Sequence, residues 1–242
     1  MMSTKTATLN GPGLVYVQFP VSPDLAHSAY DKRENDKIAS YLLEKGLLSH
    51  ASQWKCADVS QGDRYLMLYQ VVDLAAFNAK FHSLSTSDDL LPTTTSRENK
   101  RVASIEAYAT FYSLAETVGK HEDGEGDAHR LTHIITAGMQ PQTSESSAEL
   151  DRWYREEHNE QMSKEPGWTR SRRYRLAKLD KKGGSPTKHD ASAPEWMTIH
   201  EFGDGNCLSD QVEPLDPVTD WTRKIMGDMA SIEAYVWKNA LS

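Results

Sequence analysis

The sequence is poor in cysteine, in positive charge and in long apolar runs. Two cysteines, Cys56 and Cys207, cannot supply the disulfide framework of a small secreted protein. The formal net charge is −8 at pH 7, so the overall field repels nucleic acid and anionic membrane surfaces. No apolar run approaches the roughly 20 residues of a membrane-spanning helix, and the polar start, MMSTKTATLNGPG, lacks the apolar stretch of a secretory signal. We therefore expect a cytoplasmic protein with neither a nucleic-acid nor a membrane partner.

Motifs of cofactor chemistry are missing as well. There is no His-x-His or His-Glu-x-x-His motif, and no cysteine pair lies at metal-ligand spacing. No Gly-rich phosphate loop follows a predicted strand, and no Ser-His-Asp signature is present. Dispersed histidines could still meet in the fold, but the sequence favours a protein without a metal or an organic cofactor.

What is present is a repeated word. The letters ASIEAY occur at Ala103–Tyr108 and again at Ala230–Tyr235, and six identical letters favour a duplicated unit over chance. Two Gly-containing polar stretches, 116–129 and 180–194, are typical of flexible connections. We expect a tail over residues 1–12, a first repeat over 13–115, a linker over 116–129 and a second repeat over 130–242.

Each half carries the same predicted order of elements, β-α-β-β-α-β, which is the ferredoxin-like unit. Alternation predicts a first strand at Leu14–Phe19 and at Leu131–Thr136, and a charged helix that ends before a glycine follows in each half. The third strands, Tyr65–Val71 and Trp196–Phe202, also correspond, and ASIEAY belongs to the last strand of each half. The predicted fold class is therefore α+β: two tandem ferredoxin-like repeats that form a pseudo-dimeric α+β barrel in one chain.

Period-2 alternation assigns each strand side chain to the helix-covered face or to the barrel interior. Small and branched residues are predicted under the helices, together with Phe19 and Met197: Val15, Val17, Phe19, Ile105, Ala107, Met197, Ile199, Ile232 and Ala234. The opposite parity places aromatic and polar residues inside: Tyr16, Gln18, Tyr69, Glu106, Tyr108, His133, Trp196, Thr198, His200, Glu233 and Tyr235. Such an interior is typical of a small-molecule site. The alternative is that the faces are exchanged and these residues contact solvent.

The stretch DRWYREEHNEQMSKEPGWTRSRRYRL, at 151–176, resembles the EthD-like branch of the dimeric α+β barrel superfamily, in particular its tandem-repeat members of fungal type. The residues that carry the resemblance are Trp153, Tyr154, Glu157, His158, Pro166, Gly167, Trp168 and the run 170–174, with TIHEF and SIEAY in support. In the first half Tyr30 and Glu34 stand opposite Tyr154 and His158, so a functional histidine of this helix is kept once. The resemblance implies an eight-stranded barrel. The family includes polyketide cyclases, cofactor-free anthrone-type monooxygenases, lactone isomerases, decarboxylases, dehydratases and haem-dependent enzymes.

His158 is the first catalytic candidate. Leu150, Tyr154 and His158 form an i, i+4 row, which places the imidazole at the edge of the helix that faces the sheet. A histidine there can take and return a proton. Glu157 points about 100° away and is not an automatic partner. The alternative is a histidine that only closes the seam between helix and sheet with a hydrogen bond.

His133 and His200 are the next catalytic candidates, since their parity points inward and a carboxylate such as Glu106 or Glu233 could lie near them. The alternative for both is a self-satisfied polar network.

The predicted interior also supplies a binding surface. In RSRRYR, Arg170 and Arg172 share one strand face and could bind a substrate carboxylate or enolate. The alternative is that they are solvated and paired with Glu156, Glu157 or Glu160. The predicted substrate-binding residues are Tyr16, Tyr69, Glu106, Tyr108, Trp153, Tyr154, Trp168, Arg170, Arg172, Trp196, Glu233 and Tyr235.

These observations favour a cofactor-independent acid–base enzyme of secondary metabolism. It would be a cyclase, dehydratase, decarboxylase or isomerase acting on a hydrophobic polyketide-like or aromatic molecule. Three alternatives stay open: a cofactor-free monooxygenase of a phenol or anthrone, a non-catalytic ligand-binding or stress-associated barrel, and a haem-binding protein. Pairing of two such chains into a homodimer also stays open.

Overall fold

A computed structural model describes residues 10–19, 32–62, 64–86, 109–119, 131–177 and 193–240. The first ASIEAY, with Glu106 and Tyr108, lies outside these residues, as do Tyr30, most of the tail over 1–12 and most of the stretch over 180–194. Helices long and apolar enough to cross a membrane are absent from the described residues. The chain divides into two compact units, of which unit 1 holds residues 1–54, 62–114 and 176–193, and unit 2 holds the rest.

The elements follow one another as the sequence predicts. They are β1 (Gly13–Phe19), α2 (Lys32–Glu44), β2 (Leu48–Cys56), β3 (Tyr65–Val71), α3 (Leu74–Thr86), β4 (Ala109–Gly119), β5 (His133–Pro141), α5 (Ser144–Trp153), η2 (Tyr154–His158), α6 (Asn159–Met162), β6 (Trp168–Leu176), β7 (Trp196–Phe202), α7 (Asp220–Gly227) and β8 (Met229–Asn239), with a 3-10 turn, η1 (Val59–Gln61), after β2. The order β-α-β-β-α-β therefore occurs twice, and the predicted α+β class is confirmed.

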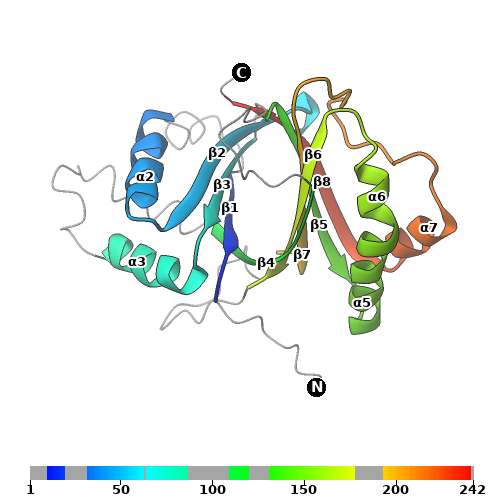
Figure 1. The fold of residues 1–242 in the computed structure, drawn as a ribbon, viewed down its shortest axis with the longest axis horizontal. Helices are drawn as coiled ribbons and strands as arrows, with labels where there is room; N and C mark the ends of the chain where they lie inside the picture. The colour runs from blue at the N-terminus through cyan, green and yellow to red at the C-terminus, as the bar shows by residue number, and fades with distance from the viewer. Residues whose placement is uncertain are drawn as a thin grey trace. The chain divides into compact units, whose positions relative to one another are not determined.

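Unit 1 orders its strands β4-β1-β3-β2, with β1 antiparallel to both β3 and β4. Helices α2 and α3 lie along one face of this sheet (Figure 1). The core forms there, from Val15 and Val17 of β1 packed with Ile38, Leu42, Leu74 and Phe77 of the helices. Helix α2 ends at a glycine as predicted: Gly46 has φ 66°, and Gly46 N and Leu47 N donate to the carbonyls of Leu43 and Leu42.

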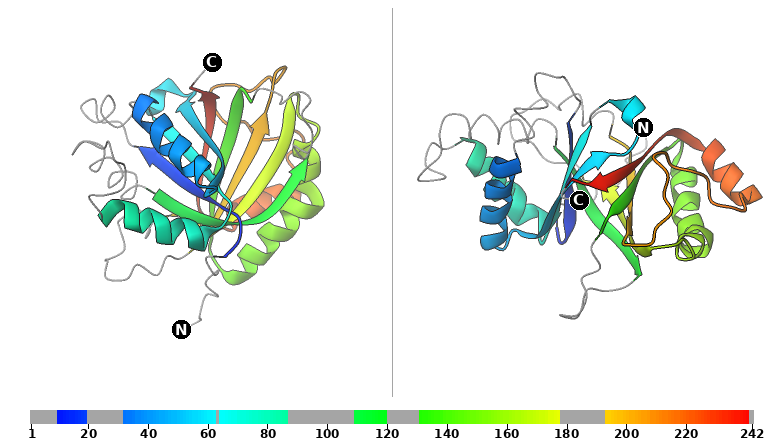
Figure 2. Two further views of the ribbon diagram at one scale, coloured as in Figure 1. Left: turned by 60° about the vertical axis from the view of Figure 1, so that its left-hand side comes forward. Right: turned by 90° about the horizontal axis from the view of Figure 1, so that it is seen from above.

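Unit 2 orders its strands β8-β5-β7-β6. In both units the fourth strand of the half therefore lies at one end, followed by the first, the third and the second. Strand β5 is antiparallel to β7 and β8, and β6 is antiparallel to β7. Figure 2 shows α5 and α6 as parts of one helix that runs across this sheet. The second ASIEAY lies in β8, as predicted. The closure of the sheets into one barrel stays a prediction.

Strand β4 extends further than the sequence predicts. It runs to Gly119, so the first four residues assigned to the linker, 116–119, are strand. A Cβ on Gly119 would lie 2.5 Å from the carbonyl oxygen of Thr169, so the close approach of β4 to β6 requires glycine there. The composition of this stretch suggested a loop, but Glu116 has a buried arginine as its partner, as described below.

The predicted faces are correct for part of the sheets and wrong for β3, β5 and β7. Val15 and Val17 pack under the helices, but Tyr69 joins the same core and does not point away from it. Trp196 packs against Leu150, Trp153 and Tyr154, and His200 contacts His158. The side chains at odd-numbered positions of β5, which include His133, also face the helices, since Ile135 packs with Met162 of α6. The prediction assumed that polar side chains avoid helices. It failed because α5 and η2 supply the polar and aromatic partners.

The last strand follows its predicted parity. Val236 packs with Met162 of α6, so Ala234 and Ile232 share the helix side, although Ile232 is 43% exposed. Glu233 and Tyr235 therefore lie on the opposite face. Tyr235 is partly buried and Glu233 is exposed.

Candidate functional site

The candidate site is built on a π-helical turn in the long helix of unit 2. Helix α5 begins at the N-cap Thr143, whose side chain accepts a hydrogen bond from Ser146 N. The helix then widens at η2, where the N–H of Asn159 donates to the carbonyl of Tyr154, five residues earlier. Such turns are rare and frequently mark functional sites. This one ends at His158.

The wide turn gathers three rings. The imidazole of His158 stacks on the indole of Trp153, with centroids 4.3 Å apart and planes 25° apart. The ring of Tyr154 meets the same imidazole edge-on at 4.8 Å. Trp153 and Tyr154 are almost fully buried. The imidazole is therefore held by residues both four and five positions before it, which a single α-helical row would not provide.

The sheet supplies the second histidine. His200 of β7 lies 5.4 Å from His158 between ring centroids. Its Nδ1 is 2.7 Å from the hydroxyl of Ser171 on β6. That hydroxyl accepts a hydrogen bond from the indole N–H of Trp168 at 3.0 Å, so its own proton can be donated to His200. His200 and Ser171 are buried.

Both histidines are neutral at physiological pH. Burial, with a smaller contribution from the Arg173 charge, lowers the pKa of His158 to about 3. Burial, followed by His158 and Arg173, holds the pKa of His200 well below its usual value. The Nδ1 atom of His158 is buried and has no hydrogen-bond partner in the described part of the chain. A polar atom in that condition is rare in native proteins and points to a missing partner.

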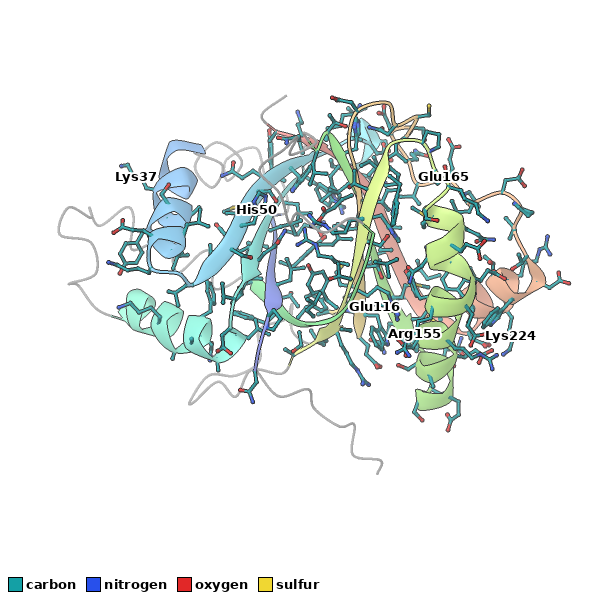
Figure 3. The ribbon with its side chains drawn as sticks, viewed as in Figure 1. Lys37, His50, Glu116, Arg155, Glu165 and Lys224 are labelled. Atoms are coloured by element: carbon teal, nitrogen blue, oxygen red, sulfur yellow. The ribbon has the colours of Figure 1, made fainter. Side chains whose placement is uncertain are left out.

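A buried cation borders the two histidines. Arg173 of β6 is 1% exposed, and its guanidinium lies 4.3 Å from the ring centroid of Tyr154 and 5.0 Å from that of Trp196. It donates hydrogen bonds of 3.0 Å to Glu116 and to Asp151. Arg155 pairs with the same two carboxylates, and Figure 3 shows Arg155 on the helix beside Glu116 of β4. Two arginines and two carboxylates thus form one balanced network.

Glu157 connects the π-turn to α7. Its Oε1 accepts hydrogen bonds from Trp153 Nε1 at 3.0 Å, from Thr219 Oγ1 at 2.7 Å and from Thr222 Oγ1 at 3.0 Å. Burial by itself would raise the pKa of Glu157, but the hydrogen bonds from Thr219, Thr222 and Trp153 lower it below the usual value. Glu157 is therefore an anion that holds three neutral donors.

The cluster contains two of the three predicted catalytic residues and four of the predicted binding residues. His158 and His200 lie there, with Trp153, Tyr154, Trp168 and Trp196 around them. His133 does not. Its Nδ1 is 3.1 Å from Thr132 Oγ1 and 3.2 Å from Asn206 Nδ2. Its pKa is lowered by burial first and by Lys238 second, against an opposite effect of Asp210.

The other predicted binding residues lie elsewhere. Arg170 and Arg172 occupy the sheet face away from the helices, where both pair with the buried Glu201. The alternative, solvated arginines paired with Glu156, Glu157 or Glu160, is therefore wrong, because those carboxylates lie on the helix and the partner is Glu201. Glu233 and Tyr235 share the face of Arg170 by their register. Tyr16 and Tyr69 belong to unit 1.

Sequence reasoning missed Ser171, Arg173, Asp151 and Glu116. Alternation along RSRRYR places Ser171 and Arg173 on the strand face opposite to Arg170 and Arg172. The sequence therefore did indicate that Ser171 and Arg173 lie together. Asp151 and Glu116 carried no such signal, since they lie on α5 and β4 and their partner Arg173 comes from β6. Within the described residues, no three His, Cys, Asp or Glu side chains come together in a way that could hold a metal ion.

Comparison with known proteins yields a likeness of fold. No protein-family model matches the chain, and no curated protein matches its sequence. A candidate monooxygenase from Fusobacterium nucleatum superposes with a TM-score of 0.55 and 10% identity, over 95% of this chain and 92% of that one. An anthrone oxidase-like protein superposes with a TM-score of 0.53 and 8% identity, over 96% and 92%. The chain shares its fold with both. Identities this low carry the α+β fold and leave the chemistry to be argued from the site.

Proposed function

We propose that this protein is an enzyme that binds an aromatic or polyketide-like small molecule at the His158–His200 cluster and moves a proton with His158. One observation carries the proposal. The Nδ1 atom of His158 is buried, has no hydrogen-bond partner among the described residues, and lies at the end of a π-helical turn among aromatic rings, whereas the neighbouring His200 has a hydroxyl partner. A substrate hydroxyl or activated C–H group would supply the missing partner.

The depressed pKa of His158 keeps the imidazole neutral and makes it a weak base until a substrate anion lies beside it. The neutral imidazole is ready to accept a proton, but an isolated imidazolium would be costly in so buried a place. A substrate that loses its proton becomes an anion beside the new cation, and the pair restores charge balance. The proton moves from substrate to Nδ1, the electron pair stays on the substrate as an enolate or phenolate, and the proton then returns to product or solvent.

The surroundings favour a ring-shaped substrate. Trp153, Tyr154, Trp168 and Trp196 supply apolar and aromatic surface near the histidines, and such surfaces bind flat aromatic molecules well. The buried Arg173 adds positive charge that favours an anion in the site. A cyclase, dehydratase, decarboxylase or isomerase of the EthD-like kind would use this arrangement.

A cofactor-free monooxygenase is the second candidate, and the shared fold with a candidate monooxygenase and an anthrone oxidase-like protein favours it. The first step is the same proton transfer. The carbanion of an anthrone would then react with dioxygen, so that one oxygen atom becomes the new ring carbonyl and the other leaves as water. The two candidates differ in whether dioxygen is consumed.

Anthrone serves as the probe for both. We expect the protein to accelerate deuterium exchange at C10 of anthrone in D₂O under argon. The substitution His158→Gln should lower that exchange rate by at least about tenfold. His133→Gln is the matched control, since His133 lies away from the cluster, and it should retain the rate. Oxygen uptake in air with formation of anthraquinone would assign the monooxygenase. Binding of anthrone, seen as tryptophan quenching, without exchange or oxygen uptake would leave a ligand-binding protein and reject the enzyme.

A further inference from the structure

Trp153 has a role in the cluster that depends on its neighbour Glu157. The indole stacks on the imidazole of His158 at 4.3 Å, and its N–H points to Glu157 Oε1 at 3.0 Å and to Thr222 Oγ1 at 3.3 Å. Trp153 is 2% exposed. The hydrogen bonds of the indole N–H therefore fix the position of the Trp153 ring that stacks on His158.

Glu157 is anchored at the start of α7. Thr219, the N-cap of that helix, donates to Glu157 and also accepts from Thr222 N at 3.0 Å. No lysine or arginine forms an ion pair with Glu157 in the described ranges, and its three partners are neutral donors. A glutamine could accept the same three hydrogen bonds, so geometry alone does not require a charge here.

We infer that Glu157 is a positioning residue for the proton transfer at His158: it holds Trp153 against the imidazole and lends negative charge to the indole. This inference rests on the proposed function of His158. A hydrogen bond from the indole N–H to a carboxylate is charge-assisted and makes the ring face more electron-rich. The stacked indole then attracts the imidazolium that forms when His158 accepts a proton. Glu157 thus favours the protonated state of a residue that it does not touch.

The experiment separates the position of the indole from the charge. Glu157→Gln keeps the acceptor and removes the charge, Glu157→Ala removes both, and Glu156→Gln is the matched control because Glu156 is an exposed neighbour on the same turn. We expect Glu157→Gln to lower kcat for deuterium exchange of anthrone by about tenfold, with KM within about twofold. Glu157→Ala should lower kcat further, and Glu156→Gln should match the unaltered protein. Thermal unfolding of each variant checks that the fold persists.

A second readout does not depend on catalysis. In proteins labelled with ¹⁵N-tryptophan and ¹³C-histidine, Glu157→Gln should move the indole N–H resonance of Trp153 upfield. Glu157→Ala should also shift the ring resonances of His158, because the stacked indole moves. If both resonances stay in place in both Glu157 variants, the positioning role is overturned. If the resonances move as expected but the unaltered protein does not exchange anthrone, the role of Glu157 in placing the rings holds while the proposed function fails.

Discussion

His158 and His200 differ in what their Nδ1 atoms contact. His200 Nδ1 has the hydroxyl of Ser171 at 2.7 Å, while His158 Nδ1 has no hydrogen-bond partner within the part of the chain that the structure describes. A satisfied nitrogen orients a ring, and an unsatisfied one is available to a ligand. We therefore propose that His158 transfers the proton and that His200 is held in orientation by Ser171.

The depressed pKa of His158 also predicts how stability depends on pH. The pKa of His158 is about 3 in the folded protein against 6.5 in the unfolded chain. Between these values the unfolded chain binds a proton that the folded protein does not, so the free energy of unfolding falls as pH falls. We expect His158→Gln to reduce this dependence by about 1.4 kcal/mol per pH unit between about pH 5.5 and 4.5. Urea unfolding of both proteins across that range measures it.

His133→Gln is the comparison for that measurement. The imidazole of His133 is less buried than that of His158, and its pKa is lowered by burial and by Lys238 against an opposing effect of Asp210. Its loss should therefore change the pH dependence less. Equal slopes for His158→Gln and the unaltered protein would show that His158 is protonated in the folded state.

At the scale of elements, the helix formed by α5, η2 and α6 determines the site. It carries Trp153, Tyr154 and His158 within six residues, and it supplies Asp151 to the buried Arg173. The helix begins outside the cluster, at an exposed cap. Its stability can therefore be tested without touching the site.

The cap gives a prediction at this scale. Thr143→Ala removes the acceptor for Ser146 N and leaves a donor of the first turn to water. We expect a loss of about 1 kcal/mol in the free energy of unfolding, measured by urea denaturation. Ser144→Ala is the control, because Ser144 Oγ only contacts the adjacent Glu145 side chain. A cost for Ser144→Ala as large as that for Thr143→Ala would contradict the capping role.

At the scale of the whole molecule, the two units share strands. Strand β2 ends in unit 2 with Lys55 and Cys56, and β4 passes from unit 1 to unit 2 after Leu114. A strand that loses its pairing in one part cannot keep its register independently in the next. We therefore expect the chain to unfold as one cooperative system.

The tryptophans allow this to be tested. Trp54 belongs to unit 1, and the other tryptophans, Trp153, Trp168, Trp196, Trp221 and Trp237, belong to unit 2. In Trp54→Phe, fluorescence reports unit 2 alone, while far-UV circular dichroism reports both units. We expect the two urea transitions to coincide. A fluorescence midpoint that differs from the dichroism midpoint would show that the units unfold separately.

The order of the elements could be read from the sequence, because alternation in strands, periodicity in helices and glycine at helix ends are local properties. The aromatic and histidine residues of the 151–168 segment were also identified there, because neighbouring positions on a helix meet in almost any context. The glycine and acidic residues of 116–129 suggested a linker for the same local reason, and for 116–119 that prediction was wrong because these residues belong to β4.

Tertiary structure alone decided which face of the sheet carries the site. Every residue of β7 is buried, so no contrast between an apolar and a polar face was present to guide the parity of His200 and Trp196. Arg173 is stabilised by Glu116, 57 positions away, and by Asp151, 22 positions away. Such pairs form only once β4, the helix and β6 have packed, because a charge can be buried only where opposite charges meet it.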